Sequence, residues 1–91
     1  MNKQLCMHCY ISGKVQGVWF RASAQEEAKR LGINGWARNL ADGRVEIFAC
    51  GNQEQLEEFD KWLKNGPPLA EVTNYIREDL AWKDYRGFDT L

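Results

Sequence analysis

The sequence predicts an α/β chain of the α+β sandwich type, in which two helices cover one face of a four-stranded antiparallel sheet. Apolar residues alternate along four segments, as they do in half-buried strands. Along two other segments they recur every three or four residues, which is typical of amphipathic helices. The order of these segments is strand, helix, strand, strand, helix, strand, and this order favours a split βαβ arrangement.

The first strand is expected over residues 4–12 and the first helix over residues 20–31. The strand places Leu5, Met7, Cys9 and Ile11 on one face and Cys6, His8 and Tyr10 on the other. In the helix the apolar positions recur at helical spacing, and Gly32 follows where a left-handed residue commonly ends a helix. The helix therefore has one apolar face to set against a sheet.

A hairpin is expected next, with strands at 33–40 and 44–51 joined by the tight connection Ala41–Gly43. Asn52 then offers an N-cap with Gln55 three residues later, which predicts a second helix up to the break at 65–68. Its apolar stripe consists of Leu56, Phe59 and Leu63, widened by Trp62. A fourth strand is expected over 71–77, followed by a loop at 82–87 and a final Phe88.

In the split βαβ topology, the third strand lies between the first and the second and is antiparallel to both. The loop after the first strand and the end of the second strand then project from the same edge of the sheet. Ligands of open α/β layers commonly bind outside such strand ends. The sheet face opposite the helices is expected to stay partly open.

Composition limits the partners and the location of the protein. The 91 residues, 44% of them hydrophobic, suffice for one domain with one modest core. With 12 Lys and Arg against 13 Asp and Glu, the chain lacks the positive field on which nucleic-acid affinity depends, so we expect no nucleic-acid partner. No segment approaches membrane-spanning length and residues 1–4 start no apolar leader, so we expect a soluble cytoplasmic protein without a membrane partner.

The three cysteines are read in terms of metal binding and of disulfide formation. On a strand, Cys6 and His8 face one side and Cys9 the other, so these residues cannot close around one ion and we expect no metal site. The predicted topology brings Cys6, near the start of the first strand, beside Cys50, near the end of the third, on the same face. A cross-strand disulfide and two reduced neighbours both remain open, because a reducing cytosol disfavours the bridge.

The run GKVQGVWFR at residues 13–21 is the strongest functional signal. Its two glycines allow the backbone to turn N–H groups toward a ligand, the helix start adds partial positive charge, and Arg21 offers a fork of donors that matches phosphate. This pattern predicts a phosphate-binding loop. Taken alone it has plainer readings, in which Gly13 and Gly17 are turn glycines and Arg21 is a solvated surface charge.

A second motif, GWARN at 35–39 followed by DGRVE at 42–46, favours the phosphate-binding loop over these plainer readings. With the first motif and the intervening helix, it makes the chain similar to the acylphosphatase family along essentially its whole length. The resemblance implies a ferredoxin-like βαββαβ fold and a single acylphosphatase-like domain over residues 1–91. Leu40, where many members carry a hydroxyl residue, and Trp19, at a variable loop site, are small departures from the family pattern.

The resemblance also implies hydrolysis of the carboxyl–phosphate bond of small acyl phosphates, without metal or organic cofactor. It assigns catalysis to Arg21 and Asn39, and the phosphate-binding loop would comprise Gln16, Gly17, Val18, Trp19, Phe20 and Arg21. Arg21 would hold phosphoryl oxygens, and Asn39, which cannot act as a base, would orient the attacking water. Inorganic phosphate is then the product and an expected inhibitor, and we expect a monomer.

No general base is evident, since His8 lies within a strand and neither motif offers a ligand-facing carboxylate, so we expect a substrate phosphate oxygen to accept the proton. The alternatives to an enzyme are a non-catalytic ferredoxin-like ligand- or RNA-binding module, using Tyr10 and Phe48 on the open sheet face, and a regulatory domain that binds carbamoyl phosphate within a larger assembly.

Overall fold

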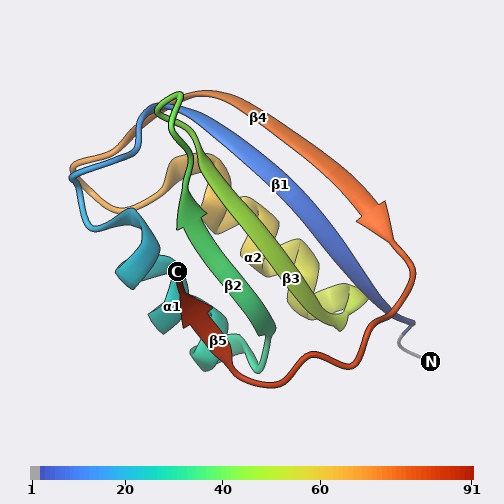
Figure 1. Cartoon of the computed structure of the whole chain (residues 1–91). Coiled ribbons are helices and arrows are strands. Elements are labelled where there is room, and N and C mark those ends of the chain that lie inside the picture. Colours follow the sequence, from blue (N-terminus) through green and yellow to red (C-terminus); the bar gives the residue numbers. More distant parts are fainter. Residues whose placement is uncertain (1–2) are drawn as a thin grey trace.

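The computed structural model describes residues 3–91, so the expected domain bounds of 1–91 include two residues outside the description. It contains strands and helices in the order expected, plus one additional strand (Figure 1). The strands are β1 (Gln4–Lys14), β2 (Asn34–Asn39), β3 (Val45–Asn52), β4 (Glu71–Leu80) and β5 (Phe88–Thr90). The helices are α1 (Phe20–Leu31) and α2 (Gln53–Asn65).

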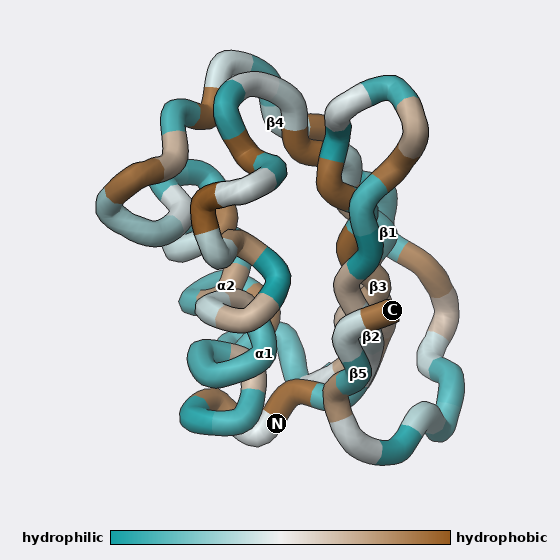
Figure 2. Tube along the Cα trace, turned by 60° about the vertical axis from the view of Figure 1, so that its left-hand side comes forward, coloured by the Kyte–Doolittle hydropathy of each residue, from teal (hydrophilic) through white to brown (hydrophobic). Residues whose placement is uncertain are grey.

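The strand order in the sheet is β4-β1-β3-β2-β5. β3 pairs antiparallel with both β1 and β2, which confirms the predicted split βαβ topology. Figure 2 shows α1 and α2 together on one side of the sheet, as the sequence predicted.

The predicted count of four strands, all antiparallel to their neighbours, is wrong by one strand. β5 pairs in parallel with β2, from Gly35 opposite Phe88 to Ala37 opposite Thr90. Three residues are too few to show a strand periodicity, and a parallel partner about fifty residues earlier leaves no local sequence signal. The ferredoxin-like class holds, and the additional strand places the end of the chain at the outer edge of β2.

The core lies between the helices and the sheet and follows the predicted faces. Its strand members include Met7, Cys9, Ile11, Val45, Ile47 and Ala49, all fully buried. The helices contribute Ala24, Ala28, Leu56, Phe59 and Leu63 to the same cluster. Each large apolar side chain buried in this way contributes about 1.5–3 kcal/mol relative to an exposed one, so the two-layer packing accounts for the orientation of both helices.

The helix ends also agree with the sequence. Gly32 closes α1 with φ of 75°, a left-handed conformation that costs glycine no steric strain. At the start of α2, the Asn52 side chain accepts a hydrogen bond from the Gln55 N–H while the Gln55 side chain accepts one from the Asn52 N–H, each 2.8 Å long. This reciprocal capping box satisfies two donors that the helix itself leaves unpaired.

The sheet face opposite the helices is less open than expected. Figure 2 shows the segment between β4 and β5 running along this side of the sheet. Tyr85 of that segment packs edge-on against Phe48, with ring centroids 5.9 Å apart, and the Lys83 N–H lies 3.2 Å from the Cys6 sulfur. The Glu46 carboxylate on the same face is bound by both His8 and Arg38 and is almost buried.

Cys6 and Cys50 lie directly opposite each other in the β1–β3 register, where the structure joins them in a disulfide with an S–S distance of 2.04 Å. Of the two arrangements that the sequence left open, the structure thus carries the bridge. Cys9 lies on the other face of β1, in the core, and its thiol is free.

In residues 3–91, no helix combines the length and the apolar character that a membrane span requires.

Candidate active site

The loop from β1 to α1 turns sharply between two buried anchors. Val15 and Val18 are both buried, while Gly17, one of the two residues between them, has φ of 75°. Trp19, the last residue before α1, also has a left-handed backbone, with φ of 66°. Such closely spaced reversals of the backbone direct N–H groups to one side of a loop, which is how proteins form concave anion sites.

The first turn of α1 faces this loop and provides positive potential. The Trp19 carbonyl accepts the first helical hydrogen bond from the Ser23 N–H at 3.0 Å. The Trp19 side chain makes no capping hydrogen bond to the helix, and the first turn contains no acidic residue. The helix dipole therefore acts on whatever lies at the mouth of the loop, and an anion is the favoured occupant.

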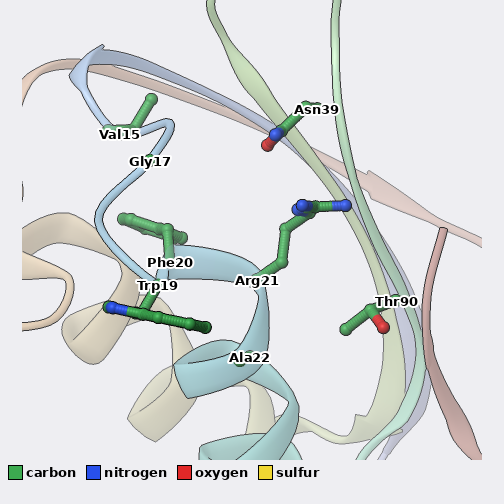
Figure 3. A pocket seen from close by; sticks show the side chains of 8 residues that line it. All are labelled: Val15, Gly17, Trp19, Phe20, Arg21, Ala22, Asn39 and Thr90. Atoms are coloured by element: carbon green, nitrogen blue, oxygen red, sulfur yellow. The ribbon is translucent and has the colours of Figure 1, made fainter.

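Arg21 stands in this first turn and reaches across the mouth of the loop. In Figure 3 its guanidinium lies between Asn39 on one side and Thr90 on the other. Its Nη1 donates a hydrogen bond of 2.8 Å to the carbonyl oxygen of Leu91. One N–H of the fork is thus fixed by the end of the chain, so the orientation of the guanidinium is constrained before any ligand binds.

Asn39 is the last residue of β2 and is exposed. β1 and β2 run parallel on either side of β3, so the loop after β1 and the end of β2 meet at the same end of the sheet (Figure 1). Arg21 and Asn39 line the same pocket of about 340 Å³. The other lining residues are Val15, Gly17, Trp19, Phe20, Ala22 and Thr90.

The expected loop residues thus fall into two groups. Gly17, Trp19, Phe20 and Arg21 line the pocket, whereas Gln16 and Val18 are not among its lining residues. The Gln16 side chain points away to the β2–β3 turn, where its Nε2 donates to the carbonyl oxygens of Leu40 at 2.8 Å and Arg44 at 3.0 Å. Val18 is packed in the core.

Sequence reasoning missed three lining residues, namely Val15, Ala22 and Thr90. Val15 lies within the 13–21 run and Ala22 directly follows it, so their positions in the sequence could have suggested both. Thr90 is brought to the pocket by β5, and the only signal for that strand was the isolated apolar Phe88, which is buried beside α2 with its ring 6.0 Å from that of Phe59.

The titratable side chains that could compete for a catalytic role lie elsewhere. No lining residue of the pocket is a carboxylate or a histidine. His8 is on the opposite sheet face, with its Nε2 2.5 Å from the Glu46 carboxylate. In the described part of the chain, no three His, Cys, Asp or Glu side chains are grouped to hold a metal ion.

Comparison with known proteins finds relatives along essentially the whole chain. The family model described as acylphosphatase matches residues 7–90. A curated acylphosphatase of Legionella pneumophila (strain Paris) is 65% identical over 91 residues, the full length of both chains.

Solved structures give the same result. An acylphosphatase from Coxiella burnetii superimposes with a TM-score of 0.92 at 41% identity, over 97% of this chain and 93% of that one. The acylphosphatase of Bacillus subtilis gives a TM-score of 0.92 at 35% identity, over 96% of this chain and 98% of that one. The chain therefore belongs to the acylphosphatase family, enzymes that hydrolyse the carboxyl–phosphate bond of acyl phosphates.

Proposed function

We propose that the chain binds the phosphoryl group of a small acyl phosphate between the 16–21 loop and Arg21, and that Asn39 positions the water that attacks it. The observation that carries this proposal is the shared pocket of Arg21 and Asn39 at the uncapped start of α1. A tetrahedral dianion there meets a helix N-terminus, a guanidinium and loop amides at once. Inorganic phosphate, the product, satisfies the same groups and should inhibit competitively.

Arg21 supplies charge and orientation. Its hydrogen bond to Leu91 engages one of the five guanidinium N–H groups and leaves the others for phosphoryl oxygens. Phosphoryl transfer passes through a loose transition state in which negative charge is spread over these oxygens. A guanidinium held in place beforehand stabilises that charge without having to reorganise during the reaction.

Asn39 acts through position rather than proton affinity, because its amide does not titrate near neutrality. Its carbonyl oxygen can accept a hydrogen bond from the water while its NH₂ group donates to a phosphoryl oxygen. The water oxygen then forms a bond to phosphorus as the bond between phosphorus and the acyl oxygen breaks, and the carboxylate departs with that electron pair.

The water proton goes to a phosphoryl oxygen of the substrate, since no lining residue of the pocket is a carboxylate or histidine. A carboxylate is a good leaving group, so positioning and charge stabilisation suffice for this step. Replacing His8 by alanine should leave turnover intact wherever the protein remains folded, because His8 lies on the opposite sheet face. Loss of turnover in folded His8→Ala would contradict this assignment of the proton.

The alternative of a non-catalytic ligand- or RNA-binding module relied on a free sheet face. The 81–87 segment lies against that face, and Phe48 is half-buried between Trp36 and Tyr85. Stacked bases need exposed aromatic faces, so the arrangement favours the enzyme. That residues 1–91 are one unit, that the protein is a cytoplasmic monomer and that it has no nucleic-acid or membrane partner remain predictions.

Steady-state turnover of acetyl phosphate tests the proposal. Arg21→Ala and Asn39→Ala should each lower kcat/KM by about 10²–10³-fold, the usual loss when a group that stabilises the transition state is removed. Arg21→Ala should also weaken inhibition by inorganic phosphate, whereas Asn39→Ala should weaken it less. Arg86→Ala, at an arginine 89% exposed on the distant segment, and Asn65→Ala serve as matched controls. Equal activity of all four variants would overturn the proposal.

A further inference from the structure

The pocket is larger than a phosphoryl group requires. Its volume of about 340 Å³ falls within the range of cavities that hold whole small molecules. Gly17, Arg21 and Asn39 surround the end that fits the anion. The remaining part is bounded by Trp19, Ala22 and Thr90 (Figure 3), and this part is open to the acyl group of the substrate.

Trp19 is an unusual neighbour for that space because its side chain is 76% exposed. Tryptophan is normally buried on at least one face, since its ring removes a large apolar area from water. Among the aromatic pairs and cation–π contacts of residues 3–91, none involves its indole. The ring therefore contributes little to the folded core.

The backbone of Trp19 adds a second unfavourable feature. Its φ of 66° and ψ of 24° lie in the left-handed region, and it is the one residue other than glycine with positive φ in the described chain. Glycine would adopt this conformation without the clash that a Cβ atom causes. An exposed tryptophan with a strained backbone destabilises the folded protein. Its position at the mouth of a ligand pocket therefore points to a contribution to ligand binding.

We infer that the indole of Trp19 is the platform on which the acyl group of the substrate lies, so that this residue sets how strongly a flat aromatic acyl group is preferred to an acetyl group. This inference rests on the proposed function, because it requires the phosphoryl group to be held at Arg21. In Figure 3 the indole lies beside the start of α1 and extends toward Ala22, whose small side chain adds little bulk to the pocket wall. An aromatic acyl group gains a stacking contact there that an acetyl group cannot make.

The test compares kcat/KM for benzoyl phosphate with kcat/KM for acetyl phosphate. One aromatic stacking contact corresponds to a factor of about five. Trp19→Ala should therefore lower the benzoyl-to-acetyl ratio about fivefold, and Trp19→Phe, which keeps an aromatic ring, should retain most of the native ratio. Alanine and phenylalanine both carry a Cβ atom, so the two variants share the backbone strain and differ in the ring.

Trp82→Ala is the matched control, because Trp82 is also partly exposed but lies in the 81–87 segment, outside the pocket. It should leave the ratio at its native value. A benzoyl-to-acetyl ratio that is unchanged in Trp19→Ala, or lowered equally in Trp82→Ala, would refute the role of Trp19 as a platform while leaving the proposed function intact. Failure of the native chain to hydrolyse either substrate would instead refute the proposed function.

Discussion

The side-chain amide nitrogen of Gln16 lies 2.8 Å from the carbonyl oxygen of Leu40, the residue directly after Asn39. The same nitrogen also donates to the carbonyl of Arg44 at 3.0 Å, so both of its hydrogens are used. One side chain of the phosphate loop thereby fastens the loop to the strand end that carries Asn39. We infer that Gln16 is a positioning residue, which sets the distance between the loop and Asn39, the residue proposed to orient water.

Gln16→Leu keeps the size of the side chain and removes both hydrogen bonds. It should lower the free energy of unfolding by about 1–3 kcal/mol, because two carbonyl groups lose a partner. It should also lower kcat about tenfold, since small displacements of a catalytic group are costly in rate. Chemical denaturation and steady-state kinetics measure the two effects, with Asn65→Ala as control. A stability loss with native kcat would show that Gln16 has no positioning role.

Phe88 anchors β5, and through it the contact between Leu91 and Arg21. The side chain of Phe88 is only 3% exposed, while that of Leu91 is 59% exposed. Phe88→Ala should therefore lower the free energy of unfolding by about 3–5 kcal/mol and should weaken phosphate inhibition, because the carbonyl that holds Arg21 loses its support. Leu91→Ala keeps that carbonyl and should change neither quantity. Native phosphate affinity in folded Phe88→Ala would contradict this coupling.

Glu46 should make stability depend on pH in the acid range. Burial alone would raise the pKa of its carboxyl, but the hydrogen bonds from Arg38 and His8 outweigh burial and lower the pKa below the ordinary value of 4.5. A lowered pKa in the folded state means that the contribution is complete above pH 4.5 and is lost as the pH falls through the folded value. Asp60 has a lowered pKa as well, so part of the acid dependence belongs to it.

Glu46→Gln should therefore lower the free energy of unfolding at pH 7 by about 1–3 kcal/mol. The difference from the native protein should shrink as the pH falls from 4.5 through the lower folded pKa, because a protonated Glu46 carboxyl is neutral, like the glutamine amide. Denaturant titrations between pH 7 and the acid range measure this difference, and turnover at pH 7 should be native because Glu46 lies outside the pocket. A difference that stays constant down to low pH would contradict the assignment.

The disulfide predicts a thiol count and a loss of stability on reduction. Protein denatured without reductant should show one free thiol, from Cys9, and three would rule out the bridge. In the folded protein even Cys9 should resist thiol reagents at neutral pH, because burial raises its pKa to about 11 and only the thiolate reacts. The bridge spans 44 residues, so a Cys6→Ala, Cys50→Ala double variant should lose about 4 kcal/mol on the loop-entropy model.

Local pattern was enough to predict most elements. The bounds predicted for α1, 20–31, are those observed, since Gly32 and the apolar spacing act within a few residues of the helix itself. The capping box of Asn52 and Gln55 is equally local, and so is the alternation that places Met7, Cys9 and Ile11 in the core. The predicted topology and strand parity correctly placed Cys6 and Cys50 as neighbours. Strand parity could not decide whether the two cysteines are oxidised or reduced.

What depends on contacts between distant residues could not be read from the sequence. β5 forms because Phe88 packs against Phe59 of α2 while its backbone pairs with β2, and neither partner is near it in sequence. The use of Gln16 as a tie to Leu40, the hold of Leu91 on Arg21 and the exposure of Trp19 arise in the same way. The sequence was enough to nominate residues for the chemistry, because motifs are local. Their orientation was decided by tertiary packing, which alone brings the β1–α1 loop, Asn39 and Thr90 to one pocket.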